Sequence, residues 1–307
     1  MTGAHVALIA HGGAGRWRPG SDADALAGLE RAVALGRAIL LGGGSALDAV
    51  CATAVALEDD PHYNAGTGAV LNFDGEVELD ACVMVGEGRH VGAVAALRDV
   101  RNPILVARKV MEETDHVMLA GEGARRFARA MGFGGWDCIT AARRADWADK
   151  KARQDQALAM KCRTFLKAHP DYAGGTIGAV AIDRQGVLAA ATSTGGVTLK
   201  LAGRVGDTPI PGAGNYASRH VAASATGTGE FVLRALATRS LSEHVEHGAS
   251  LEEAMARVMD QQGRDFDADV GIIAVDREGR TLARHRTPDM PHAWFEGEGA
   301  VRALMRA

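Results

Sequence analysis

Two apolar segments in the second half of the 307-residue chain share nearly the same design. Residues 177–182 (Ile-Gly-Ala-Val-Ala-Ile) and 270–275 (Val-Gly-Ile-Ile-Ala-Val) each run into an Asp-Arg-x-Gly sequence. Turn residues that follow an apolar run and precede another predict a β-hairpin with antiparallel strands. Because the runs are almost continuously apolar, both faces of these strands are expected to be covered. The chain is therefore expected to contain buried, mainly antiparallel sheets rather than a parallel dinucleotide-binding sheet.

Helical segments are expected before and between these hairpins. Apolar residues at helical spacing predict a helix over Asp22–Leu41, and Ser45 with Asp48 three residues later predicts an N-cap that opens a helix ending near Glu58. Four further helices are predicted, over residues 103–113, 122–131, 229–246 and 251–262. A strand at 6–10 and a hairpin of 69–73 with 76–85, turning at Asp74-Gly75, complete the expected elements.

Grouped helices beside hairpin-rich regions indicate helical layers outside the sheets. The predicted fold class is therefore α+β, a four-layer αββα sandwich of two mainly antiparallel sheets between helical layers. Residues 134–175 differ from the rest, because they are polar and charged and end in Ala-Gly-Gly. This composition predicts a partly helical, weakly ordered linker, and linkers of about 40 residues inside compact folds are uncommon and usually functional or disordered.

Bulk composition excludes several classes of protein. The chain has 34 basic and 38 acidic residues, and a net charge of −4 gives no electrostatic reason to expect nucleic acid or an anionic membrane as a partner. No apolar run approaches the roughly 18–20 residues that span a bilayer, and the first residues lack a basic targeting region. A cytoplasmic protein is expected. The cysteines are widely spaced, which predicts buried thiols: Cys51, Cys82, Cys138 and Cys162.

Threonine and glycine are concentrated in four short segments of the second half: 175–178, 192–196, 203–207 and 226–230. A single threonine in a strand usually reflects β-propensity. Together, however, these segments offer a nucleophile, hydroxyl and amide donors, and an Arg/Asp pair suited to a small zwitterion. A threonine hydroxyl needs a base, and in N-terminal-nucleophile enzymes that base is the residue's own α-amine. The amine at Thr176 exists only if the bond from Gly175 is broken, and a glycine there tolerates strained backbone.

The order of these segments, together with motifs in the first half, resembles the plant-type asparaginase or isoaspartyl peptidase family of N-terminal-nucleophile hydrolases. The likeness covers most of the chain except the charged linker. The motifs of the first half that carry it are His11-Gly12-Gly13-Ala14-Gly15, Asn64-Ala65-Gly66, Glu78-Leu79-Asp80-Ala81, Arg101-Asn102-Pro103 and Gly121-Glu122-Gly123-Ala124.

The resemblance implies an N-terminal-nucleophile hydrolase fold and self-cleavage between Gly175 and Thr176. One structural domain would then consist of an α subunit, residues 1–175, and a β subunit, residues 176–307. By the same resemblance each candidate site residue has a role: nucleophile (Thr176), orienting hydroxyl (Thr194), substrate carboxylate and amine clamp (Arg204 and Asp207), oxyanion donors (Thr226 and Gly227) and a substrate-binding loop residue near the nucleophile (Asn64).

The implied activity is hydrolysis of L-asparagine and β-aspartyl dipeptides to L-aspartate, through a β-aspartyl-enzyme and without a catalytic cofactor. The resemblance also implies a dimer of cleaved αβ units and a structural sodium ion, bound by main-chain carbonyls of Leu57, Glu58, Asp60, Tyr63, Ala65 and Thr67. Ile177 stands where many relatives have valine, and no histidine directly precedes Gly174-Gly175. Two alternatives remain at this point: a glycosylasparaginase-like hydrolase, and a non-catalytic amino-acid-binding protein that uses Arg204 and Asp207.

Overall fold

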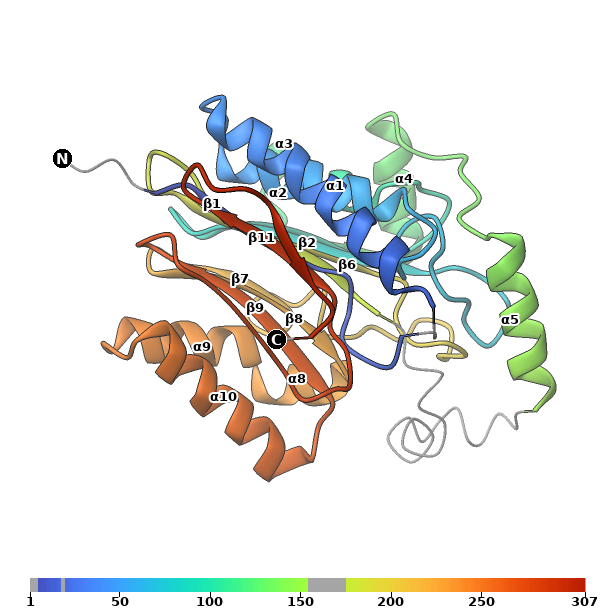
Figure 1. Cartoon of the computed structure of the whole chain (residues 1–307). Helices are drawn as coiled ribbons and strands as arrows, with labels where there is room; N and C mark the ends of the chain where they lie inside the picture. The colour runs from blue at the N-terminus through green and yellow to red at the C-terminus, as the bar shows by residue number, and fades with distance from the viewer. Residues whose placement is uncertain (1–4, 18–19, 154–174, 307) are drawn as a thin grey trace.

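A computed structural model describes residues 5–17, 20–153 and 175–306, and these form helices and two sheets (Figure 1). Within the described residues the larger sheet has eight strands, in the order β12 (Arg302–Leu304), β11 (His292–Glu296), β1 (Ala7–His11), β5 (Ile177–Ile182), β6 (Leu188–Thr194), β2 (Leu79–Val85), β3 (His90–Leu97) and β4 (Met118–Ala120). Its pairs are antiparallel except β3 with β4. The smaller sheet is antiparallel, in the order β10 (Thr281–His285), β9 (Val270–Asp276), β8 (Val221–Gly227) and β7 (Asn215–Ala217).

The two sheets face each other, and each carries helices on its outer face (Figure 1). Helices α1 (Asp22–Leu41), α2 (Ala46–Glu58) and α3 (Pro103–Glu113) pack on the larger sheet, while α9 (Ala237–Glu246) and α10 (Leu251–Phe266) pack on the smaller one. Side chains alternate across a strand. In β1, therefore, Leu8 belongs to the core beneath the first helices, and Ile9 belongs to the core between the sheets.

Most of the predicted elements are confirmed. The hairpins β5–β6 and β9–β10 form as expected, and α1 and α3 have the predicted bounds. The Ser45 side chain accepts the Asp48 amide, as an N-cap should. Helix α4 (Gly121–Ala130) occupies the segment predicted at 122–131, shifted by one residue, and α10 continues to Phe266.

The predicted strand at 69–73 is wrong. Asn72 makes a local turn instead, because its Oδ1 accepts the amides of Asp74 and Glu76 at 3.0 Å each. The neighbouring main chain bonds to another loop, with the Phe73 amide 2.7 Å from the Lys200 carbonyl. The strand that follows therefore begins only at Leu79.

The single helix predicted over 229–246 is also wrong. It breaks at Leu236, which has a left-handed backbone (φ 46°), into α8 (Gly229–Ala235) and α9. The amides of Thr238 and Arg239, in the first turn of α9, donate to the carbonyls of Ala213 and Gly212. These donors are thus satisfied by a loop of the smaller sheet, and they do not continue the ladder of α8.

The expected linker begins with ordered structure. Helix α5 (Ala141–Ala152) is capped by Thr140 and contacts the Asn72 turn through the Trp147 indole, which donates to the Asn72 carbonyl at 2.9 Å. The rest of that linker, 154–174, lies outside the described residues, as does Cys162. The other thiols are buried as expected, and burial raises the pKa of Cys51, Cys82 and Cys138 to about 12.

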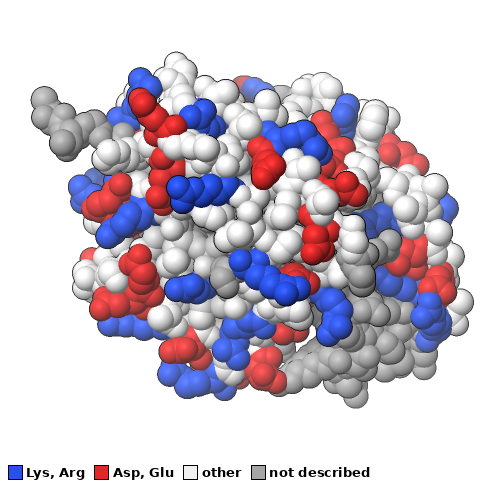
Figure 2. Space-filling model, viewed as in Figure 1, with Lys and Arg blue, Asp and Glu red and all other residues white. Residues whose placement is uncertain are grey.

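In the described part of the chain, none of the helices has the length and apolar character that a bilayer span requires. On the face shown in Figure 2, acidic and basic side chains are interspersed.

Candidate active site

Thr176 lies immediately before β5, a strand inside the larger sheet. Its side chain is buried, and its hydroxyl donates to the Thr194 hydroxyl with the two oxygens 3.2 Å apart. The hairpin explains the contact, because its register pairs Ile177 with Ser193 and so brings the residues just beyond that pair together. Strand alternation turns Ser193 to the opposite face, where its hydroxyl bonds to Glu58.

The carbonyl oxygen of Gly175 accepts two side-chain hydrogen bonds. The Asn64 Nδ2 lies 2.6 Å from it, and the Thr194 hydroxyl lies 3.2 Å from it. Asn64 is itself fixed, since its Nδ2 also donates to the Gly196 carbonyl at 2.7 Å and its Oδ1 accepts the Val70 amide at 2.8 Å. The carbonyl before the candidate nucleophile is therefore held by two preorganised donors.

A cavity of about 250 Å³ opens over Thr176, and it brings together most of the predicted site. Thr194, Arg204, Asp207 and Gly227 also line it. A second cavity of about 500 Å³ adjoins it and contains Asn64 and Gly175. Residues 14–16 line both cavities.

Arg204 has an ion-pair partner that sequence reasoning did not assign. Its Nε and Nη2 each lie 2.9 Å from Glu230 Oε1. Asp207 is buried beside it, and burial, opposed by the Arg204 charge, raises the pKa of this carboxyl to about 7. Its Oδ2 has no hydrogen-bond partner among the described residues. An arginine and a buried carboxyl with an unused oxygen form a suitable pair of anchors for an α-carboxylate and an α-ammonium group.

The two predicted oxyanion donors are placed differently. Gly227 lines the cavity with a backbone φ of 132°, and a Cβ there would come within 2.2 Å of the Asp269 carbonyl, which explains the glycine. Thr226 is fully buried next to the cavity-lining residue Gly227, and its hydroxyl accepts the amide of Ala14 at 3.1 Å. The hydroxyl proton of Thr226 is not used by that bond.

Beside the candidate nucleophile lies a chain of buried polar side chains that was not predicted. His11 Nε2 is 3.0 Å from the Ser224 hydroxyl, which is 2.8 Å from the Thr192 hydroxyl. Burial lowers the pKa of His11 to about 3, so the imidazole is neutral at physiological pH. A Cβ at Gly178 would collide with Ser224 and His11, so only glycine fits there. Polar residues at alternate positions of apolar strands were the available sequence signal.

The predicted sodium loop has suitable chemistry for a hard cation, whose preferred ligands are oxygen atoms. The Glu58 carbonyl accepts the Thr67 amide at 2.8 Å, and Gly66 lies so close that a Cβ there would be 2.6 Å from the Glu58 oxygen and 2.8 Å from the Arg101 oxygen. Two main-chain oxygens therefore lie beside Gly66, and of these only the Glu58 oxygen belongs to the predicted sodium ligands. The Glu58 carboxyl is buried, which raises its pKa to about 8. Its Oε1 accepts the Ser193 hydroxyl and the Ile104 amide.

Comparison with known proteins defines the class of this fold and site. The asparaginase family pattern matches residues 4–305, and the chain belongs to the plant-type asparaginase and isoaspartyl peptidase family of enzymes, as its motifs predicted. Among particular relatives, the plant-type L-asparaginase of Pyrococcus abyssi is 44% identical over 95% of this chain and 96% of its own. The isoaspartyl peptidase/L-asparaginase of Macaca fascicularis is 41% identical over 94% and 92%, and that of Xenopus laevis is 40% identical over 98% of each.

Proposed function

We propose that this protein cuts itself between Gly175 and Thr176 and then hydrolyses L-asparagine and β-aspartyl dipeptides to L-aspartate. The observation that carries the proposal is the Thr194 hydroxyl, which contacts both the Thr176 hydroxyl and the Gly175 carbonyl oxygen. In this proposal the packed layers are the αββα sandwich of N-terminal-nucleophile hydrolases. Residues 1–175 and 176–307 would then be two subunits of one domain.

Self-cleavage begins when the Thr176 hydroxyl oxygen attacks the Gly175 carbonyl carbon. Negative charge develops on the Gly175 oxygen, where Asn64 and Thr194 already donate. The carbon–nitrogen bond then breaks and the nitrogen takes up a proton to become the Thr176 amine, leaving an ester between Gly175 and the threonine oxygen. Water hydrolyses the ester and frees the hydroxyl.

In the cleaved protein the α-amine is the base that the hydroxyl requires. Its reference pKa of about 7.7–8.0 leaves a useful neutral fraction near physiological pH. Arg204 would bind the substrate α-carboxylate and Asp207 its α-ammonium group, and Thr176 attacks the side-chain amide carbon. The Thr176 α-amine passes the proton it took from the hydroxyl to the leaving nitrogen, which departs as ammonia or as the amine of the second amino acid. Water then hydrolyses the β-aspartyl ester, which releases aspartate and restores the Thr176 hydroxyl. Thr226 and Gly227 are the proposed oxyanion donors, Thr226 through the proton that its bond from Ala14 does not use.

The proposal also includes a bound sodium ion and a dimer. A sodium ion would be held by the main-chain oxygens of the loop that contains Glu58 and Ala65, and it would supply rigidity to the segment that leads to Asn64. Two cleaved units would form a dimer, as the family resemblance implies. No catalytic step is assigned to the ion.

Electrophoresis and turnover of the purified protein test the proposed function together. Two fragments should appear, the second beginning at Thr176, and ammonia should be released from L-asparagine. Thr176→Ala should give one intact, inactive chain, whereas Thr176→Ser should still cut. An intact wild-type chain with full activity contradicts the mechanism, and binding of aspartate without any turnover would favour an amino-acid-binding protein.

A further inference from the structure

The residues proposed to clamp the substrate lie on a segment without regular secondary structure. Residues 195–207 follow β6 and form turns and bends, and they include Arg204 and Asp207. A segment of this kind needs external contacts to hold a charged side chain in one place. Contacts near the two clamp residues come from Glu78, directly before β2, and from Asp80 within it, both in the first half of the chain.

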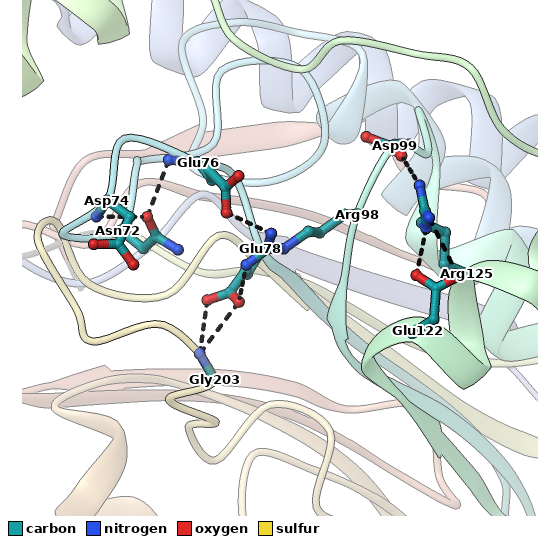
Figure 3. Close-up of polar contacts among 9 residues, drawn as sticks. All are labelled: Asn72, Asp74, Glu76, Glu78, Arg98, Asp99, Glu122, Arg125 and Gly203. Atoms are coloured by element: carbon teal, nitrogen blue, oxygen red, sulfur yellow. Dashed lines mark hydrogen bonds and ion pairs between the residues drawn. The ribbon is translucent and has the colours of Figure 1, made fainter.

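Glu78 supplies the first contact. The side chain is buried, and its Oε1 and Oε2 accept the Gly203 amide at 3.2 and 3.0 Å. Figure 3 shows the carboxylate directed at Gly203, the residue before Arg204. Arg98 holds the other side, 2.8 Å from Oε1. Burial alone would raise the pKa of Glu78, but the bonds from Arg98 and Gly203 outweigh it and lower the pKa below its usual value.

Asp80 and Lys200 add two further contacts between residues 78–80 and the same segment. The Asp80 Oδ2 accepts the Gly206 amide at 3.4 Å, directly before Asp207, and its Oδ1 accepts the Ala96 amide at 2.8 Å. The buried Lys200 ammonium donates to the Glu78 carbonyl at 2.9 Å. Two carboxylates, one directly before β2 and one within it, thus hold the amides that immediately precede the two clamp residues.

We propose that Glu78 is a positioning residue for the substrate clamp: its carboxylate fixes the Gly203 amide and thereby the place of Arg204 in the cavity, with Asp80 doing the same before Asp207. The inference rests on the proposed function. Among the described residues Glu78 makes no hydrogen bond to Thr176 or Gly175, so its effect falls on substrate binding and not on the nucleophile.

The chain contains a matched control. Arg98 also pairs with Glu76, on the outer side of the same guanidinium (Figure 3). Glu76 is about half exposed and makes no hydrogen bond to residues 195–207 among the described contacts. A substitution at Glu76 therefore removes an equal charge beside Arg98 while the amide of Gly203 keeps its acceptor.

The test compares Glu78→Gln with Glu76→Gln in the full-length protein. A displaced Arg204 would lose a charge-assisted hydrogen bond to the substrate carboxylate, which corresponds to about 10- to 100-fold in affinity. Glu78→Gln should therefore raise the KM for L-asparagine about 10- to 100-fold, because either orientation of the glutamine amide turns its NH2 group toward a donor, the Gly203 amide or the Arg98 guanidinium. It should also weaken L-aspartate binding, measured by calorimetry, by a similar factor. Self-cleavage should go to completion, and kcat should stay within about threefold of wild type, because Thr176, Thr194 and Asn64 are untouched. Glu76→Gln should match wild type in its KM for L-asparagine and in its affinity for L-aspartate.

A folded, cleaved Glu78→Gln protein with wild-type KM and aspartate affinity would overturn the inference, as would an equal rise of KM in Glu76→Gln. If Glu78→Gln does not fold, Glu78→Asp replaces it. That variant keeps the negative charge beside Arg98 but is one methylene too short for Gly203, and its KM should also rise. Failure of the proposed function is a separate result, because wild-type protein would then turn over neither asparagine nor β-aspartyl dipeptides.

Discussion

The Thr194 hydroxyl lies 3.2 Å from the Thr176 hydroxyl, which donates to it, and it donates in turn to the Gly175 carbonyl oxygen, also at 3.2 Å. The Gly196 amide donates to the same Thr194 oxygen at 2.9 Å. Because the Thr194 oxygen accepts two of these three hydrogen bonds, its own proton must point to the Gly175 carbonyl oxygen. One side chain therefore both orients the candidate nucleophile and stabilises the charge that its attack would create.

Replacing Thr194 by valine keeps the shape of the side chain and removes both functions. We expect Thr194→Val to slow self-cleavage by at least about 10²-fold, which is the usual cost of one lost oxyanion donor. The measurement is the fraction of intact chain over time after purification. Thr194→Ser keeps the hydroxyl and should cut much faster than the valine variant. Equal rates for valine and wild type would show that Thr194 has no part in the cut.

Asn64 provides the second donor to the Gly175 oxygen, at 2.6 Å. Asn64→Asp puts a carboxylate at that point, so an acceptor faces an acceptor and repels the developing negative charge. Cleavage should slow by about 10²- to 10³-fold, and acidic pH should partly restore it because a protonated carboxyl can donate. A cleavage rate in Asn64→Asp that does not depend on pH would contradict this assignment.

Asp207 links the site to pH-dependent stability. Burial raises its pKa from 3.8 to about 7, so folding disfavours the ionised carboxylate. Below about pH 4 the carboxyl is protonated in both the folded and the unfolded protein, and it does not lower the free energy of unfolding. Above about pH 7 it is ionised in both states, and it lowers the free energy of unfolding by its full amount. Asp207→Asn should therefore increase the free energy of unfolding at pH 8 by about 1–3 kcal/mol and change it little at pH 4.

Urea unfolding in the Thr176→Ala background measures this effect, since that chain stays in one piece. The same Asp207→Asn substitution in the cleaved enzyme should lower turnover at every pH, because the substrate ammonium loses its anchor. If Asp207→Asn changes the free energy of unfolding equally at pH 4 and pH 8, folding does not raise the pKa of the Asp207 carboxyl.

Local patterns predicted the elements whose signals are local. The Asp-Arg-x-Gly turns identified two hairpins, and Ser45 identified the start of α2. The wrong predictions arose where distant residues decide the structure. The break at Leu236 depends on acceptors at Gly212 and Ala213, and residues 69–73 bond to a loop more than a hundred residues away. A prediction from neighbouring residues does not include these partners, so it could not find either feature.

The candidate site divides in the same way. Thr176, Thr194, Arg204 and Asp207 carry motifs, and the structure brings them to one cavity. Glu230 and His11 also belong to the segments 226–230 and 11–15, but their contacts could not be assigned from sequence. Glu230 opens a helix and would serve as an ordinary acidic first-turn residue if Arg204 were elsewhere. His11 bonds to a residue more than two hundred positions later, on the other sheet.

We expect Arg16 to distinguish between the two proposed substrates. It is exposed, lines both cavities, and makes no hydrogen bond or ion pair with another described residue. Its neighbours hold the main chain in place. The amides of Gly15 and Asp289 each donate a hydrogen bond of 3.0 Å to the carbonyl of the other residue, and the Trp17 indole donates to the Gly13 carbonyl at 3.1 Å. A β-aspartyl dipeptide releases an amino acid that carries a carboxylate, whereas asparagine releases ammonia. A guanidinium at the cavity wall, carried by a main chain that is held in place, suits the former.

Arg16→Ala should therefore lower kcat/KM for β-aspartyl dipeptides about tenfold relative to kcat/KM for L-asparagine, in line with one lost charge-assisted hydrogen bond. A dipeptide whose C-terminal carboxylate is amidated should be a poorer substrate of the wild type and should be insensitive to the substitution. Arg302→Ala, which removes an exposed arginine of β12 that lines neither cavity, is the matched control. If the amidated dipeptide loses as much from Arg16→Ala as the free acid does, the arginine acts on the loop and not on the leaving group.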